Sequence, residues 1–374
     1  MPVPLLDLSR IHAPLLAQMS QAAAGVIADG RYILGPNVAA FEKEAAEWLG
    51  APHAVGVSNG TDALSAAFRA LALTRGTGRV ATTPFTFIAT AETVATAGFT
   101  PVFVDVDCET GLIDLDLLAS IPDLVGVVPV HLFGQCVDMD RLMALASERG
   151  WWVVEDAAQS FGARWGNRMS GTIGTAGCYS FFPSKNLGGV GDGGLVTTSD
   201  PELAALVRSA RAHGSSGRKY HHDFLSGNLR LDEIQAAILR VKLPCVAAWN
   251  EERRAVAARY GRLFEERGLL ASGQIRPLSC NGDHVFHQYV VRADDRDRLA
   301  AHLQKHGVGH AVYYPVPLHT MKPFHYLGYQ PDDLPVSMLL SRQTLALPVF
   351  PGLTGAEQEE VVGRIAGFYS GDAA

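Results

Sequence analysis

Between residues 50 and 200, short runs of β-branched and other apolar residues alternate with alanine-rich stretches of helical length. This alternation is typical of βαβ units that build a mainly parallel, buried sheet. Ligands of such sheets bind beyond the carboxyl ends of the strands, so polar residues after each run are candidates for chemistry. We predict an α/β fold with a mainly parallel seven-stranded sheet between helices, whose strands cover residues 53–57, 80–83, 101–106, 124–130, 151–155, 177–182 and 194–198.

Three of the intervening segments carry apolar residues near the period of an amphipathic helix. They cover residues 62–73, 87–97 and 138–149. Asp62 and Asp138 stand at the start of two of these segments, and aspartate is a favoured N-cap because its carboxylate accepts hydrogen bonds from free backbone N–H groups. The pattern predicts that each aspartate caps its helix.

The pattern changes after residue 232, where a long helix is predicted to run to about residue 268. It is expected to kink near Pro244, because proline has no N–H and its ring clashes with the preceding turn. Beyond it, a helix over residues 296–306 is predicted to lie between two strands, over 284–293 and 308–315. This α+β pattern predicts a smaller C-terminal domain.

The length of 374 residues is a soft indication of two or three domains, and large α/β units exceed the average domain size. We predict a large α/β domain over residues 1–245 and a small α+β domain over residues 246–374. The N-terminal segment 1–30 is expected to pack on the small domain.

Charge and composition exclude several classes of protein. Lys plus Arg is 31 and Asp plus Glu is 38, so the net charge of −7 argues against binding to nucleic acid. No apolar stretch approaches the roughly 18 residues of a membrane helix, and the five cysteines form no C-x-x-C pair. We expect a protein of the cytoplasm, bound to no membrane.

In a chain of net negative charge, an anionic ligand needs a local basic patch. Residues 208–230 are a candidate, because they contain five Lys or Arg and one acid, a net charge of +4.

Two glycine-containing segments are candidate phosphate sites. Residues 58–64 join a predicted strand to a predicted helix, where free N–H groups and the helix dipole favour an anion, although such turns are also common as plain structure. Residues 189–194 match G-x-G-x-x-G, but a strand rather than a helix is predicted to follow them. We therefore reject a dinucleotide-binding fingerprint there and predict a close-packed turn.

Asp156 follows an apolar strand, and Lys185 follows an aromatic strand end and precedes the glycines. Alone, the aspartate is as typical of a helix cap, and the lysine of a solvated surface group. Together with the phosphate cradle and the aromatic segment 85–87, they form a set that suits pyridoxal phosphate. That cofactor forms a Schiff base with lysine, and its ring nitrogen needs a carboxylate partner.

With these residues in place, the chain resembles the sugar aminotransferases of the DegT/DnrJ/EryC1/StrS group, which have the fold of type I pyridoxal phosphate enzymes. The resemblance spans nearly the whole chain, through the motifs GRYILGPNVAAFE, SNGTDAL, TTPFTFIATAE, TPVFVDVD, EDAAQSFGA, SFFPSKNLGGVGDGG, NLRLDEIQAAIL, YYPVPLH and LALPVFP. It is nearest to the branch that acts on 3-keto nucleotide sugars.

The resemblance implies a role for each residue that matches a cofactor position. Lys185 matches the Schiff-base lysine, which also moves the proton during catalysis, and Asp156 matches the partner of the ring nitrogen. Gln159 matches a residue near the ring, and Phe87 matches an aromatic residue stacked on its face, whereas Phe85 is expected to pack. The implied phosphate ligands are Gly60, Thr61, Ser180 and, from the neighbouring subunit, Asn228.

The last of these assignments implies a homodimer with shared active sites. Without the resemblance, Asn228 and Arg230 are more typical of a loop cap and a surface charge. The resemblance also implies substrate contacts, and no metal, at residues Arg31, Tyr32, His221, His222, Arg230, Tyr314 and His319.

The implied reaction is the transfer of an amino group from L-glutamate to a keto nucleotide sugar, with pyridoxal phosphate cycling through pyridoxamine phosphate. The favoured acceptor is C3 of a UDP-2-acetamido-3-keto hexose or its uronate, for lipopolysaccharide or lipid A sugars. A dTDP-3-keto-6-deoxyhexose or a 4-keto sugar remains an alternative, because uridine and thymidine differ by one methyl group. Dehydratases with His in place of the lysine, and a non-catalytic regulatory protein of the same fold, are disfavoured by the presence of Lys185.

Overall fold

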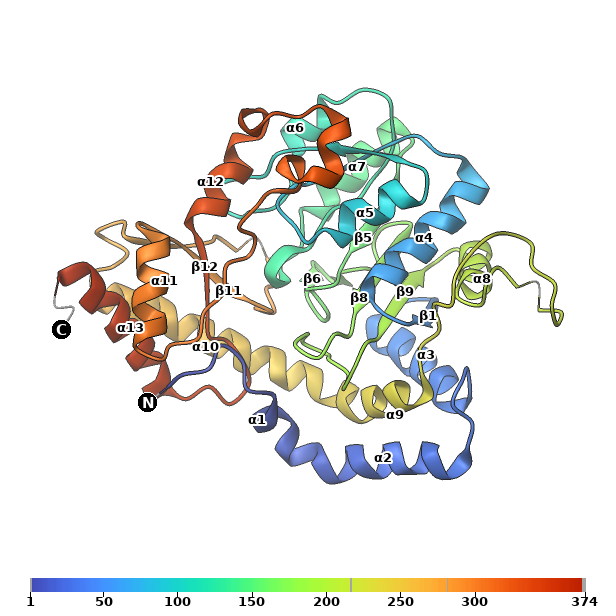
Figure 1. Cartoon of the computed structure of the whole chain (residues 1–374), viewed down its shortest axis with the longest axis horizontal. Coiled ribbons are helices and arrows are strands. Elements are labelled where there is room, and N and C mark those ends of the chain that lie inside the picture. Colours follow the sequence, from blue (N-terminus) through green and yellow to red (C-terminus); the bar gives the residue numbers. More distant parts are fainter. Residues whose placement is uncertain (1, 216, 281, 372–374) are drawn as a thin grey trace.

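The computed structural model of the chain describes residues 2–215, 217–280 and 282–371 (Figure 1). A seven-stranded sheet lies at its centre, with strand order β1-β9-β8-β5-β4-β2-β3. All neighbours are parallel except at β9, which runs antiparallel to both β1 and β8. The predicted α/β fold is confirmed, with the strands β1 (His53–Val57), β2 (Arg79–Thr82), β3 (Thr100–Phe103), β4 (Leu124–Val127), β5 (Trp152–Asp156), β8 (Ala176–Ser180) and β9 (Gly194–Thr198).

Helices cover both faces of this sheet because successive strand residues point to opposite faces. In β8, Cys178 joins the cluster formed with α4 (Gly60–Arg75), α5 (Ala89–Thr96) and α8 (Pro201–Ala210), whereas Tyr179 joins the cluster formed with α3 (Pro36–Leu49). Farther along the sheet, α6 (Leu115–Ala119) and α7 (Met139–Arg149) pack on the same side as α3. Because helices bury both faces of the sheet, side chains on both faces of each strand are apolar, and this explains the continuous apolar runs in the sequence.

One of the two predicted helix caps is confirmed. Asp138 accepts a hydrogen bond from the Arg141 N–H and begins α7. Asp62 does not begin α4, because the helix starts two residues earlier and Asn59 is its N-cap. The Asn59 side chain accepts from the Asp62 N–H at 2.8 Å and donates to the Asp62 carboxylate at 3.0 Å.

The long helix predicted after residue 232 is present in two parts. Helix α9 (Glu233–Lys242) passes through the 3-10 turn η3 (Leu243–Cys245), which contains Pro244, into α10 (Val246–Glu266). Figure 1 shows this pair running from beneath the large sheet to the smaller one. The glycine-rich segment 189–194 runs directly into β9, as predicted, and opens no helix.

The C-terminal part contains a second sheet, of order β10-β11-β12, formed by β10 (Ile275–Pro277), β11 (Tyr289–Ala293) and β12 (Thr344–Leu347). Helices α11 (Arg296–Lys305) and α13 (Gly355–Ser370) pack against it. The strand predicted over residues 308–315 was wrong, because only Val308 and Ala311 pair, each as a single bridge with a different partner. The strand β12 was missed.

The N-terminal segment comprises α1 (Leu8–His12), η1 (Ala13–Leu15) and α2 (Leu16–Asp29). Val3 pairs with Val308 beside the second sheet, whereas α2 lies along α9 beneath the large sheet (Figure 1). The division of domains at residue 245 stays a prediction. The remaining elements are the hairpin β6 (Arg164–Trp165) and β7 (Arg168–Met169), the helix α12 (Pro335–Gln343), and the 3-10 turns η2 (Leu132–Gly134), η4 (Leu318–Thr320), η5 (Lys322–Leu327) and η6 (Pro331–Asp333).

Candidate active site

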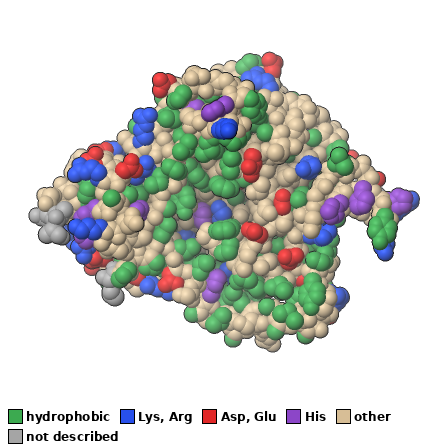
Figure 2. All heavy atoms as spheres, viewed as in Figure 1, with side chains coloured by type: hydrophobic (Ala, Val, Ile, Leu, Met, Phe, Trp, Pro, Cys, Tyr) green, Lys and Arg blue, Asp and Glu red, His purple; other side chains and the backbone are tan. Residues whose placement is uncertain are grey.

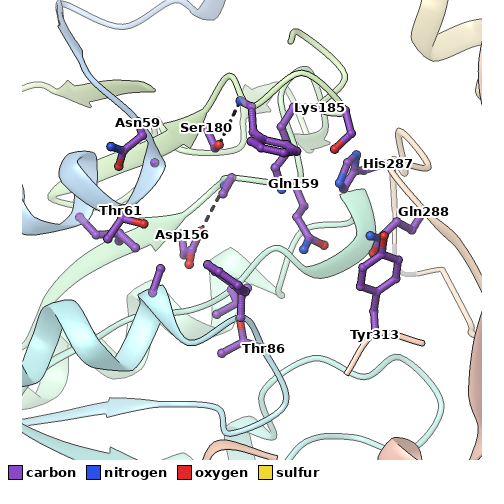
Figure 3. Close-up of a pocket in the computed structure, with 18 of the residues that line it drawn as sticks. Asn59, Thr61, Thr86, Asp156, Gln159, Ser180, Lys185, His287, Gln288 and Tyr313 are labelled. Carbon is purple, nitrogen blue, oxygen red and sulfur yellow. Dashed lines mark hydrogen bonds between the residues drawn. The ribbon is translucent and has the colours of Figure 1, made fainter. Parts of the chain in front are cut away.

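A cavity of about 540 Å³ opens at the carboxyl ends of the large sheet's parallel strands. The large sheet supplies one wall, and His287, Gln288, Tyr313 and Tyr314 from the C-terminal part supply the other (Figure 3). The space-filling view shows this face hollowed near its centre, with apolar side chains around the hollow (Figure 2). The position is the one expected for a ligand of a doubly wound sheet.

The N-terminus of α4 forms one end of the cavity. Gly60 and Thr61 begin the helix there, and Ser180, the last residue of β8, lies against them. A Cβ on Gly60 would lie 2.7 Å from the Ser180 Cβ, so only glycine permits this close approach. Free N–H groups, a serine hydroxyl and the positive end of the helix dipole then converge at this end of the cavity, an arrangement that binds phosphate.

Asp156 ends β5 and is 6% exposed. Its Oδ2 accepts a hydrogen bond from the Thr90 hydroxyl at 2.7 Å, and its Oδ1 accepts from the Ala158 N–H at 3.2 Å. Burial raises the pKa of this carboxyl, whereas the hydrogen bond from Thr90 and the charge of Lys185 act in the opposite direction. The cavity therefore contains a carboxylate that a positively charged ligand atom would stabilise.

Lys185 lies in the connection between β8 and β9. Because β9 is antiparallel to β8, the chain crosses the carboxyl edge of the sheet without a crossover helix. The Lys185 N–H donates to the Phe182 carbonyl at 2.8 Å, which folds this connection into a tight turn. Burial lowers the pKa of the lysine amine to about 8, and no hydrogen bond joins that amine to any described residue. The amine faces the cavity and sheds its proton far more readily than an exposed lysine does.

Gln159 links the two walls of the cavity. Its Oε1 accepts from the Phe133 N–H at 2.7 Å, and its Nε2 donates to the Tyr314 hydroxyl at 3.0 Å. Phe85 is fully buried with its ring edge-on to Tyr314, in agreement with its predicted packing role. Phe87 also lines the cavity and is 56% exposed, so its ring is available to a ligand.

These features fit pyridoxal phosphate. The lysine amine has a lowered pKa and no protein partner, which suits attack on an aldehyde. A buried carboxylate faces the same cavity, and the helix N-terminus at Gly60 offers a cradle that a side chain would fill. Within the described residues, no group of three or more His, Cys, Asp or Glu side chains is arranged to hold a metal ion.

Seven of the predicted site residues do not line the cavity of the chain to which they belong. The exposed Arg31 pairs with Asp29 at 2.7 Å, and the exposed Tyr32 donates to the Ile27 carbonyl at 3.2 Å. His319 is 1% exposed and its Nε2 lies 3.3 Å from the Pro331 carbonyl. The remaining four, which are exposed or half-buried and lie on the segment after α8, are His221, His222, Asn228 and Arg230.

Part of the positive charge of the basic segment 208–230 is already paired within the protein. Arg211 forms an ion pair with Glu42, and both side chains are largely buried. The described part of the segment projects from the body of the protein beyond α8 (Figure 1). Tyr220 and Leu225 at this projection are 83% and 93% exposed.

Several residues at or directly behind the cavity were given no role of their own from the sequence. Thr86 lines the cavity and Thr90, at the start of α5, binds Asp156, and both occur in the motif TTPFTFIATAE. His287 and Gln288 come from a segment that was predicted as a strand, and Tyr313 belongs to the motif YYPVPLH, in which the resemblance assigned Tyr314 and His319. Nothing local in the sequence places His287, Gln288 and Tyr313 beside Lys185.

Comparison with known proteins identifies relatives along the full length of the chain. The model of the DegT/DnrJ/EryC1/StrS aminotransferase family matches residues 15–366. A "Pleiotropic regulatory protein" of Geobacillus stearothermophilus is 44% identical, with 99% of each chain covered. A UDP-N-acetyl-3-dehydro-alpha-D-glucosamine 3-aminotransferase of Acidithiobacillus ferrooxidans is 41% identical, with 97% of this chain and 96% of the relative covered.

A third relative, the dTDP-3-amino-3,4,6-trideoxy-alpha-D-glucose transaminase of Streptomyces venezuelae, is 40% identical, with 97% of this chain and 95% of the relative covered. Among solved structures, S. venezuelae DesV in complex with a ketimine intermediate is similar with a TM-score of 0.92 and 38% identity, over 98% of both chains. In sequence and in fold, the chain therefore matches these relatives over nearly its whole length.

Proposed function

The chain belongs to the DegT/DnrJ/EryC1/StrS aminotransferase family, and on that premise we propose that it moves an amino group from L-glutamate to C3 of a UDP-2-acetamido-3-keto hexose or its uronate. The product would serve lipopolysaccharide or lipid A sugars. The observation that carries the proposal is one cavity that brings together the amine of Lys185, the carboxylate of Asp156 and the N-terminus of α4.

Pyridoxal phosphate, the cofactor of this family, supplies when bound an electron sink that lets an amino group pass between two carbon skeletons. In the proposed roles, Lys185 Nζ forms the link to the cofactor and, once displaced, carries protons as a neutral amine. Its pKa of about 8 makes that neutral form accessible near neutral pH. Asp156 would hold the proton of the ring nitrogen, and Gly60, Thr61 and Ser180 would bind the phosphate.

Binding of the cofactor is tested by absorbance and by trapping. Purified protein with pyridoxal phosphate is expected to show the visible band of the lysine-linked cofactor, and L-glutamate is expected to bleach it. Borohydride reduction followed by peptide mass mapping should place the cofactor on Lys185. Lys242 is the internal control, because burial lowers its pKa to about 8 as well. Trapping on Lys242, or a band that persists in Lys185→Ala, would contradict the assignment.

The acceptor sugar is tested with a panel. The aminotransferase relative from Acidithiobacillus ferrooxidans supports a UDP-linked 3-keto sugar, whereas the one from Streptomyces venezuelae supports a dTDP-linked one. UDP- and dTDP-linked 3-keto and 4-keto sugars are each incubated with glutamate and enzyme, and the amino-sugar products are identified by mass. The proposal predicts the highest kcat/KM for the UDP-2-acetamido-3-keto sugars. Preference for a dTDP-3-keto-6-deoxyhexose or a 4-keto sugar would replace the substrate while leaving the reaction intact.

A regulatory role is the second candidate, because the relative at 44% identity carries the name of a regulatory protein. The lysine, the carboxylate and the cavity are all present in this chain, and they favour catalysis. A protein that binds pyridoxal phosphate on Lys185, yet transfers no amino group to any sugar of the panel, would favour the regulatory role.

We further propose that the chain acts as a homodimer in which Asn228 reaches the phosphate in the partner subunit's cavity, with Arg230, His221 and His222 near its substrate. None of these four residues lines the cavity of its own chain, which supports such an exchange, and part of the segment that carries them projects beyond α8 (Figure 1). Large apolar side chains exposed on the single chain also favour an interface, among them Tyr32, Ile33, Leu34, Phe87, Phe182 and Val190.

A further inference from the structure

Two threonine hydroxyls stand behind the Asp156 carboxylate, and the proposed function assigns no role to either. We propose that Thr90, supported by Thr86, is the positioning residue that keeps Asp156 ionised and aimed at the ring nitrogen of the cofactor. This inference rests on the proposed function, because it takes Asp156 as the partner of that nitrogen.

The hydroxyls form a short chain with a defined direction. The Thr90 Oγ1 lies 2.7 Å from Asp156 Oδ2, and the Thr86 Oγ1 lies 3.1 Å from the Thr90 Oγ1. An ionised carboxylate only accepts hydrogen bonds, and a hydroxyl has one proton, so Thr90 donates to Asp156 and Thr86 donates to Thr90. Donation by Thr86 polarises the Thr90 hydroxyl and strengthens its bond to the charged carboxylate.

The position of Thr90 is closed to water. Thr90 is fully buried, so water from the surface does not replace its hydroxyl, whereas Thr86 is 3% exposed and lines the cavity. The Ala158 N–H holds the other carboxylate oxygen at 3.2 Å. One donor on each oxygen fixes the plane of the carboxylate, and the remaining lone pairs are left for a ligand in the cavity.

Burial favours the protonated form of Asp156. Of the groups that oppose this effect, the Thr90 hydroxyl and the Ala158 N–H stay constant through the reaction, and Thr90 has the larger influence. The charge of Lys185 favours the ionised form of Asp156 only while the lysine is protonated. The lysine must lose that proton to act as a base. His131 also faces Asp156, but its Nδ1 accepts a backbone N–H at 3.2 Å while its Nε2 lies 2.9 Å from Glu155. Both ring nitrogens of His131 are therefore engaged with other groups, and neither donates to Asp156.

The test measures the proton on the ring nitrogen directly. Cofactor labelled with nitrogen-15 in the ring is bound to the full-length wild type and to the variants Thr90→Val, Thr90→Ser and Thr93→Val, and its ring-nitrogen NMR shift is recorded at one pH. Thr93→Val is the matched control, because Thr93 is 2% exposed on the same helix and its hydroxyl donates to the Ala89 carbonyl at 2.7 Å, not to Asp156.

We expect a protonated ring nitrogen in the wild type, Thr90→Ser and Thr93→Val. In Thr90→Val the ratio of protonated to unprotonated nitrogen should fall by about tenfold or more, because a hydrogen bond to a buried charge is lost. If Thr90→Val does not fold, Thr90→Ala, which adds no bulk, carries the same expectation. A bound cofactor whose ring-nitrogen shift is unchanged in these variants overturns the inference while leaving the proposed function standing. A wild type that binds no cofactor on Lys185 overturns the proposed function itself.

Discussion

Lys185 and Lys242 both have pKa values lowered to about 8 by burial of the amine, but their hydrogen bonds to the described residues differ. Lys242 Nζ donates to the Gly188 carbonyl and lies 2.9 Å from His12 Nε2, so it joins the N-terminal helix to the turn that follows Lys185. No hydrogen bond joins the Lys185 amine to any described residue. A similar lowering of the pKa therefore accompanies a structural contact at Lys242 and an amine without a protein partner at Lys185.

The pH dependence of cofactor attachment should report the pKa of Lys185. The neutral amine attacks the aldehyde, so the rate of attachment to the apoprotein should rise as the pH passes through about 8 and level off above it. The charge of Asp156 raises the pKa of this lysine against the larger effect of burial. Asp156→Asn should therefore move the midpoint to lower pH. Stopped-flow absorbance measures both profiles, and a midpoint near the ordinary value for lysine would contradict the burial argument.

Gly60 is the second residue at which a single change should be decisive. In Gly60→Ala the new Cβ would lie 2.7 Å from Ser180 Cβ and 3.3 Å from Ser180 Cα, so α4 and β8 must separate. The dissociation constant for pyridoxal phosphate, measured by fluorescence titration, should rise at least about tenfold, since charge-assisted bonds to the phosphate are lost.

Gly363→Ala is the matched control for Gly60→Ala. Gly363 lies inside α13, and a Cβ added there would have nothing within 4 Å. This change should leave cofactor affinity unaltered and stabilise the fold by about 0.5–1 kcal/mol, because alanine is the better helix former. Equal affinities in the two variants would show that close approach at Gly60 does not matter.

At the scale of elements, three long-range contacts hold the site's surroundings in place. Glu233 of α9 accepts from the Val38 N–H at 2.8 Å and so caps α3. Asp105, after β3, accepts from the Ser337 N–H at 2.8 Å and caps α12. In each case a buried carboxylate supplies the helix N-terminus with the acceptor that its own sequence lacks. The third contact joins the N-terminal helix to α13 through Arg10 and Glu357.

The contact between Arg10 and Glu357 should weaken in acid, so that α1 detaches from α13. Arg10 donates to both carboxylate oxygens of Glu357, at 2.8 and 2.9 Å, and its hydrogen bonds lower the pKa of that carboxyl to about 2. A carboxyl whose pKa is depressed by folding stabilises the fold above its unfolded pKa, and this contribution is lost as the pH falls from about 4.5 to about 2.

Hydrogen exchange measures the effect. Amide protection in α1 should fall across that acid interval in the wild type and should already be low at neutral pH in Glu357→Gln. Glu360→Gln is the control on the same helix, because Glu360 pairs only with Arg364, four residues along α13. Full protection of α1 in Glu357→Gln would rule out this anchoring role.

The strands of the large sheet and the positions of Asp156 and Lys185 were predictable because each follows from a local pattern: an apolar run and a polar residue just after it. The start of α4 was misplaced because Asn59 and Asp62 are both good caps, and they bind each other. The strand β12 and the hydrogen bond between Gln159 and Tyr314 were out of reach of local patterns. The latter joins residues 155 positions apart and exists only once the two parts of the chain meet.

At the scale of the whole molecule, a single chain contains the lysine, the carboxylate and the phosphate cradle, but Asn228 does not line the cavity of its own chain. Among the described residues, none of the helices combines the length and the apolar character needed to cross a bilayer. Phe182, which lines the cavity, is 53% exposed and suits contact with a protein surface, and a second copy of the chain is the proposed one.

Shared active sites can be tested by complementation. Lys185→Ala should be inactive, and Asn228→Asp should be strongly impaired, because its new charge would face the cofactor phosphate. If each cavity takes Lys185 from one subunit and Asn228 from the other, a hybrid of the two variants has one intact site. Random pairing of equal amounts should then restore about a quarter of the wild-type activity. Hybrid dimers that are seen by native mass spectrometry and remain inactive would contradict the exchange.

The two walls of the cavity come from distant parts of the chain, and this has a consequence for synthesis. The strands, the lysine turn and the phosphate cradle are complete by residue 198, whereas Tyr313 and Tyr314 follow more than a hundred residues later. A growing chain on the ribosome therefore has one wall of the cavity for several seconds before the second wall exists. Because burial lowers the pKa of the Lys185 amine, we expect that amine to reach its full reactivity only after the C-terminal part has closed the cavity.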